Sequence, residues 1–187
     1  MKSLKRLSLP ALLSVLLLQL PGGLWSALGQ TQWGMGTYHA VKGVGLALEW
    51  SRMEDLGRMG LTLDFSGVLT GKTRRPGLRA SYQRLFLSPL GQFRDGSRLS
   101  LYYGPGLGLG AVRDHNDHRG LMACLSGSVG MHFLFPESPL TVSAGLSAEL
   151  GLHAEKVEGA GNRIIRFYQN GIRRAWMPEI QLIYHFR

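Results

Sequence analysis

Four charged residues stand inside stretches that are otherwise apolar or small: Glu49, Asp64, Arg79 and Glu149. Carboxylates in such surroundings serve acid–base chemistry, bind a cation or pair with an arginine, and an unpaired buried charge is costly. His153 follows Glu149 by four residues, about 13 Å along an extended strand, so these two side chains cannot touch. The four charges therefore predict a structural, ion-paired network. A path for small solutes or protons, and acid–base catalysis, are the alternatives.

Three further groups have residue types that occur in functional sites. They are the acid and histidine pairs in "RDHNDHRG" (113–120), the glycine column in "YYGPGLGLG" (102–110), and Cys124. The first group has no second cluster at metal-ligand spacing, and the glycine column has no GK[ST] ending. The only cysteine can form no internal disulfide. We expect a solvated turn, a bare wall that leaves room for bulky side chains, and a small wall residue. No catalytic, metal or cofactor site is predicted.

The elements that must position the four charges are long alternating strands. In "PLTVSAGLSAELGLH" (139–153) every second residue is apolar and the residues between are small or polar. Most strands of soluble sheets have about 5–6 residues. Alternation over this length is typical of a wall between lipid and a polar lumen, which needs about 9–11 residues per strand. The prediction is an all-β, up-and-down antiparallel transmembrane barrel.

The same alternation recurs along the chain. It predicts eight strands, at 32–40, 43–52, 58–66, 77–88, 98–113, 120–135, 139–153 and 175–187. With both ends of the chain in the periplasm, the tight "PESP" turn (136–139) falls on the periplasmic side, and the segments 66–77 and 154–174 form outer loops. A second arrangement starts at residue 43 and takes residues 163–170 as its eighth strand.

The N-terminus has the pattern of a secretory signal peptide. "MKSLKR" is basic, "LSLPALLSVLLLQL" is apolar but too short to span a bilayer, and "ALG" offers small residues at a cleavage site. We predict a signal peptide at residues 1–29 and a barrel domain at 30–187. An uncleaved anchor helix is the alternative.

Together, the signal peptide, the alternating strands, the glycine run and the aromatic C-terminal strand "IQLIYHF" (180–186) resemble small eight-stranded outer-membrane β-barrel proteins of Gram-negative bacteria. The resemblance implies location in the outer membrane. It also implies recognition of the C-terminal strand by the barrel-assembly machinery, with Tyr184 and Phe186 matching the family's pattern and Arg187 departing from it.

Basic loops suggest the partners of such a barrel. With 21 Lys+Arg against 12 Asp+Glu spread along the chain and no nucleic-acid-binding motif, we expect lipid and lipopolysaccharide as partners, and no nucleic acid. The candidate contacts with lipopolysaccharide phosphates are Lys72, Arg74, Arg75, Arg173 and Arg174. The predicted role is structural or interactive and not enzymatic. The alternatives are a narrow channel, a lipid-A-modifying enzyme and a soluble barrel of lipocalin type.

Overall fold

The computed structural model describes residues 32–41, 43–52, 55–69, 75–113, 119–156, 163–169 and 177–186. Nine strands and one short helix lie in these ranges. They are β1 (Gln32–Ala40), β2 (Gly43–Arg52), β3 (Asp55–Asp64), α3 (Ser66–Leu69), β4 (Gly77–Gln92), β5 (Arg98–Arg113), β6 (Arg119–Leu134), β7 (Leu140–Lys156), β8 (Arg163–Phe167) and β9 (Met177–His185). Within the described ranges no helix is both long and apolar enough to cross a bilayer.

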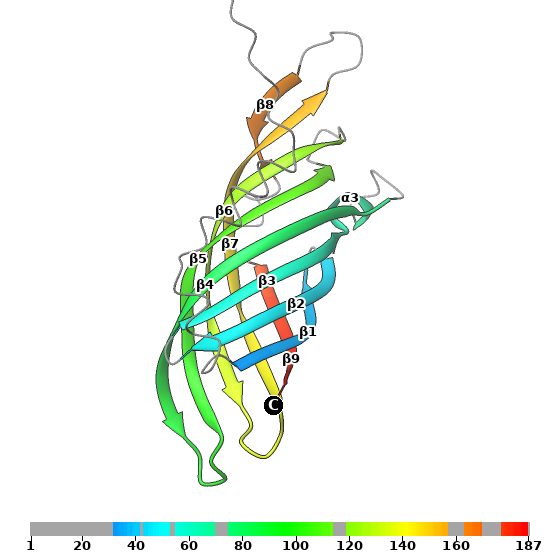
Figure 1. Cartoon of the computed structure of the whole chain (residues 1–187). Helices are drawn as coiled ribbons and strands as arrows, with labels where there is room; N and C mark the ends of the chain where they lie inside the picture. The colour runs from blue at the N-terminus through cyan, green and yellow to red at the C-terminus, as the bar shows by residue number, and fades with distance from the viewer. Residues whose placement is uncertain are drawn as a thin grey trace, which may run out of the picture. The chain divides into compact units, whose positions relative to one another are not determined.

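The strands form one closed antiparallel sheet (Figure 1). Each strand from β1 to β7 pairs with the next one along the chain, and β9 pairs with both β7 and β1. This connectivity is an up-and-down barrel of eight strands. β8 is additional, because it pairs only with the upper part of β7, from Leu152 to Lys156.

The predicted fold class and strand count are thus confirmed, with local corrections. β1, β2 and β5 have the predicted bounds, whereas β3 starts at Asp55 rather than at residue 58. The sequence predicts a loop at 154–174, but in the structure β7 continues to Lys156 and β8 forms at Arg163–Phe167. The strand of the second arrangement therefore exists, as an addition to the eight. Residues 1–31, which include the predicted signal peptide, lie outside the described ranges.

The strand register determines how far the strands tilt. A path from Leu140 of β7 can be followed from each residue to its partner on the next strand. After one turn around the barrel, this path returns to β7 at Leu150. The path is Leu140, Tyr184, Met35, Leu48, Met59, Tyr82, Leu107, Leu125 and Leu150. The offset of ten residues is the shear number. With a rise of about 3.3 Å per residue and strands about 4.8 Å apart, it corresponds to a tilt of about 40°.

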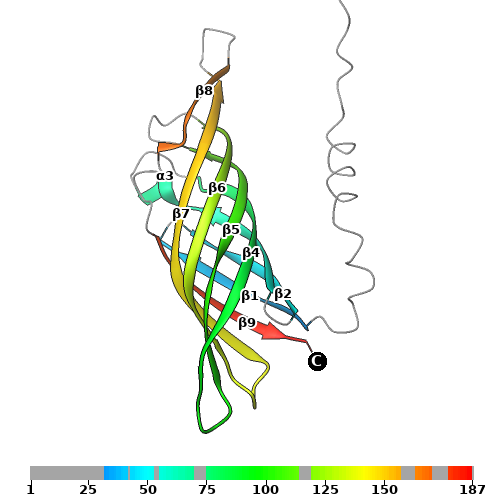
Figure 2. The same cartoon turned by 90° about the vertical axis from the view of Figure 1, so that its left-hand side faces the viewer.

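The two ends of the barrel differ. One end, called here the terminal end, carries Gln32, His185, and the turns β4–β5 (93–97) and β6–β7 (135–139). The other, the loop end, carries α3 and the upper parts of β5, β6, β7 and β8 (Figures 1 and 2). The wall is uneven in height, since β1, β2 and β9 have 9 or 10 residues while β4 to β7 have 16 or 17.

Candidate functional site

The outer wall is covered by exposed apolar side chains. Leu46, Leu61, Leu109, Leu125 and Ile180, from five different strands, are each between 52% and 63% exposed. Such residues are normal singly, but a continuous apolar surface on all sides of a barrel needs an apolar solvent. A ten-residue strand at this tilt rises about 25 Å, the height of the apolar band of outer-membrane barrels.

Aromatic rings gather on the outer wall towards the terminal end. Trp33, Trp50 and Tyr82 follow one another with ring centroids 5.5 and 6.1 Å apart. Further ring contacts on this part of the wall are Phe86–Tyr103, Phe93–Phe133, Phe133–Phe135 and Tyr184–Phe186. Aromatic residues of this kind lie at membrane–water interfaces. The chain folds as a barrel of the membrane-spanning type.

The lumen contains a first ion-pair network near the terminal end. Glu49 on β2 and Arg58 on β3 are 0% and 2% exposed, and Nε and Nη2 of Arg58 donate to Oε2 of Glu49 at 3.1 and 2.8 Å. Nη2 also donates to Oγ of Ser143 at 3.3 Å, and Ser143 bonds Nδ1 of His132 at 3.0 Å. Nε2 of His185 is 3.7 Å from Oε1 of Glu49. Side chains from five strands are thereby tied together at this level.

A second network lies nearer the loop end. Arg79 on β4 bonds Glu149 on β7 and lies 3.6 Å from Asp64 on β3. Gly108 and Gly110 of β5 leave space for the arginine, because a Cβ at Gly110 would come 3.0 Å from its Cγ. The glycine column is therefore a bare wall, and it accommodates Arg79.

A layer centred on Glu179 lies between the two networks. Glu179 on β9 is 1% exposed, and its carboxylate accepts hydrogen bonds from the hydroxyls of Tyr38 at 3.0 Å and Tyr102 at 3.2 Å. Tyr102 is fully buried and packs on Leu56 and Leu85.

Above the second network, His153 and Glu155 of β7 are buried, on the part of β7 that pairs with β8. Nε2 of His153 lies 3.2 Å from the carbonyl oxygen of Val112, and Nδ1 lies 3.8 Å from Oε2 of Glu155. Arg166 of β8 approaches Glu155 with Nε 3.4 Å from Oε1. β8 thus supplies the guanidinium of Arg166 to the carboxylate of Glu155, which lies higher than the ends of the shorter strands. Glu149 and His153 belong to different groups, so the structure does not join them in an acid–base pair.

The structure places all four charges named from the sequence, Glu49, Asp64, Arg79 and Glu149, in the lumen. It joins three of them directly, and it joins Glu49 to Arg58, a residue that sequence reasoning missed. Arg58 was not assigned to a face because the predicted strand began with it. Glu179 was missed for a similar reason, since the recognised alternation in β9 began at Ile180. Extending the alternation by one residue at each strand start would have found both.

Of the residues named as candidate lipopolysaccharide contacts, only Arg75 is described. It lies exposed at the loop end, just before β4. Lys72, Arg74, Arg173 and Arg174 lie outside the described ranges, as do Asp114, His115, Asp117 and His118. Among the described residues, no group of three or more His, Cys, Asp or Glu side chains is arranged to hold a metal ion.

Comparison with known proteins adds little to this description. No protein-family model matches the sequence, and no significant match to a curated protein is found. A solved structure, a major outer membrane protein from Thermus thermophilus, aligns with a TM-score of 0.47 and 14% identity, over 83% of this chain and 99% of that one. A likeness of this size carries no argument about function, so the assignment of a membrane-type barrel depends on the closed sheet and its apolar outer wall.

Proposed function

We propose that the protein is an outer-membrane barrel with a structural or surface-interaction role and a lumen filled by side chains. The observation that carries the proposal is the division of the wall into an apolar outer face and an ion-paired inner face. A barrel of eight strands has an interior just wide enough for side chains to fill. The buried pairs Arg58–Glu49 and Arg79–Glu149 occupy it. They support a stable scaffold better than they support a wide pore.

The first experiment tests location and fold. Cells that express the whole chain are fractionated, and the membrane fraction is run on a gel in cold detergent and after boiling. A closed hydrogen-bonded barrel keeps its structure in cold detergent and migrates differently once boiled. Recovery in the soluble fraction, without any heat-dependent shift, would favour the lipocalin-type alternative and contradict the proposal.

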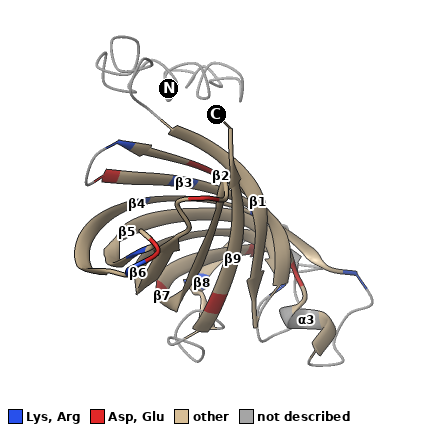
Figure 3. Ribbon diagram, turned by 90° about the horizontal axis from the view of Figure 1, so that it is seen from below, with Lys and Arg blue, Asp and Glu red and all other residues tan. Residues whose placement is uncertain are grey.

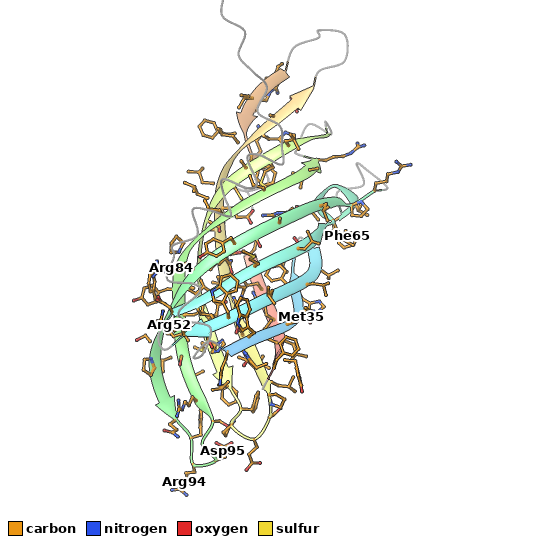
Figure 4. The ribbon with its side chains drawn as sticks, in the orientation of Figure 1. Met35, Arg52, Phe65, Arg84, Arg94 and Asp95 are labelled. Carbon is orange, nitrogen blue, oxygen red and sulfur yellow. The ribbon has the colours of Figure 1, made fainter. Side chains whose placement is uncertain are left out.

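We further propose that the loop end faces outward and contacts lipopolysaccharide phosphates through Lys72, Arg74, Arg75, Arg173 and Arg174. Arginine and phosphate form charge-assisted, often bidentate hydrogen bonds. The test replaces these five residues with alanine and measures binding of purified lipopolysaccharide. The matched control replaces Arg52, Arg94 and Arg98, which lie towards the terminal end; Arg52 and Arg94 are labelled in Figure 4. Loss of binding in the control alone would contradict this proposal.

We propose that the barrel-assembly machinery recognises the C-terminal strand. Tyr184 and Phe186 are 51% and 52% exposed on the outer wall, where another protein can contact them. The variant Phe186→Ser should lower the folded yield in cells several-fold, and Phe93→Ser, another exposed aromatic residue towards the terminal end, should not. Equal yields of the two variants would remove this assignment.

A further inference from the structure

The Tyr102 side chain crosses the lumen obliquely. In the strand register Tyr102 of β5, Gly130 of β6, Gly145 of β7 and Glu179 of β9 form one continuous row. A Cβ at Gly130 would come 2.6 Å from Cζ of Tyr102, so the ring occupies the space that the glycines leave. The hydroxyl then reaches Glu179, three strands away from β5.

Polar side chains lie on both sides of this layer. On the terminal side, the guanidinium of Arg58 lies 5.4 Å from the centroid of the Tyr102 ring. On the loop side lies a small cavity of about 30 Å³ that has room for water-sized molecules and is partly open to solvent. Its lining includes Tyr38, Gln83 and Ser147. Neither Tyr102 nor Glu179 lines it, so the cavity ends at this level.

Three successive inward-facing residues of β7 lie on the terminal side of the Tyr102 layer, at the layer and on its loop side. Ser143 accepts a hydrogen bond from Arg58, Gly145 faces the hydroxyl of Tyr102, and Ser147 lines the loop-side cavity. Ser143 and Ser147 are therefore on opposite sides of the tyrosine, about 13 Å apart along the strand.

We propose that the layer formed by Tyr102, Glu179 and Tyr38 is the permeability barrier of the lumen, and that the lumen opened at this layer conducts cations. The cavity above it is then a vestibule, closed at its floor by the Tyr102 ring. The charge of the lumen supports the preference for cations. Among the described residues, the part of the lumen from the level of His185 to the level of Asp64 holds four carboxylates (Glu49, Asp64, Glu149 and Glu179) and two arginines (Arg58 and Arg79). Acidic linings favour cations.

This inference depends on the proposed membrane barrel and locates its seal. The first test measures conductance of the purified, folded full-length protein in planar bilayers of neutral lipid. Wild type and Tyr102→Phe should be silent, because both keep the ring. Tyr102→Ser should conduct, with a several-fold preference for K⁺ over Cl⁻ in a salt gradient. A silent, correctly folded Tyr102→Ser variant, or an anion-selective one, would overturn the proposal.

A second test leaves Tyr102 in place, and so does not depend on how that variant folds. In a Cys124→Ser background, Ser143→Cys and Ser147→Cys are reconstituted separately into vesicles, and a small, membrane-impermeant methanethiosulfonate is added outside. Each orientation of the barrel in the membrane exposes at most one of the two positions. The labelled fractions should therefore add up to no more than one, with Ser147→Cys clearly labelled.

Complete labelling of both cysteines by the outside reagent would mean that the reagent passes the tyrosine. No labelling of Ser147→Cys when the reagent is present on both sides of the membrane would mean that no vestibule exists. Either result contradicts the proposal. Both experiments use purified protein in lipid, so they can fail even when fractionation places the protein in the outer membrane, and the two failures remain distinguishable.

Discussion

The outer face and the lumen face of the barrel alternate residue by residue, yet they follow different rules for charge. On β7, Leu146 is 39% exposed on the outer wall while its neighbour Ser147 is 4% exposed in the lumen. Seen from the terminal end, charged positions are spread over several strands of the ring (Figure 3). On the outer wall, Arg84 pairs with Asp55 at 3.0 Å, and these side chains are 58% and 49% exposed.

The difference lies in how each face satisfies a polar group. The lumen supplies partners, so that Arg58 has the carboxylate of Glu49, the hydroxyl of Ser143 and the ring of Tyr102 around it. Hydrocarbon supplies none, and a charge on that face must reach the membrane surface or remain unpaired. Polar side chains in the lumen therefore depend on one another, while those on the outer wall depend on their depth in the bilayer.

The largest expected effect comes from breaking a lumen pair. Arg58→Ala leaves the fully buried Glu49 without its guanidinium, and removing one partner of a buried pair costs about 3–5 kcal/mol. Arg84→Ala breaks the exposed pair with Asp55 and should cost no more than about 1 kcal/mol. Denaturant unfolding of both variants in the same detergent measures the difference. Equal costs would show that the lumen pair is effectively solvated.

A charge placed on either face of β7 gives the second comparison. Leu146→Lys puts an ammonium into the apolar belt, where it should cost about 2–4 kcal/mol near the bilayer midplane. Ser147→Lys puts the same group into the cavity that Asp64 and Glu149 also line, so it should be milder. Folded yield in lipid vesicles reports both. If both positions tolerate lysine equally, hydrocarbon does not cover the outer face.

Two glycines of β6 sharpen the comparison with a single methyl group. Around a Cβ at Gly127, on the outer wall, no atom lies within 4 Å, whereas a Cβ at Gly130 would come 2.6 Å from Cζ of Tyr102 and 2.5 Å from Cα of Gly145. Gly130→Ala should cost about 1–3 kcal/mol through overpacking. Gly127→Ala should be neutral or slightly stabilising. Thermal gel-shift midpoints of the two variants should differ accordingly.

The smallest effect concerns the β4–β5 turn at the terminal end, whose tip carries Arg94 and Asp95 (Figure 4). Hydrogen bonds from the backbone N–H and hydroxyl of Ser97 lower the pKa of Asp95 below its usual value of 3.8. Because the folded pKa is depressed, the stabilisation is present above about pH 3.8 and is lost as pH falls through the lower, folded value. The protection factor of the Ser97 amide, which is its exchange rate corrected for the intrinsic pH dependence of amide exchange, should fall in acid. In Asp95→Asn the protection factor should be nearly independent of pH.

Much of the fold could be predicted because the side-chain period of a strand is two. The alternation alone assigned Leu146 and Ser147 to opposite faces, and it predicted β1, β2 and β5 to the residue. It predicted β8 only in the second arrangement, at residues 163–170. The five residues of Arg163–Phe167 contain no clear alternation, and they pair with the upper part of β7, which extends beyond β9.

By itself, the sequence determined that the chain forms long two-faced strands, and that Glu49, Asp64 and Glu149 share the inner face. This information is local, because the face of each residue follows from its neighbours two positions away. Only the tertiary structure decided which charges meet. The shear of ten residues brings Arg79 to Glu149 and Tyr102 to Glu179 across strands that lie far apart in the chain. That offset is a property of the closed ring, and no stretch of alternating residues contains it.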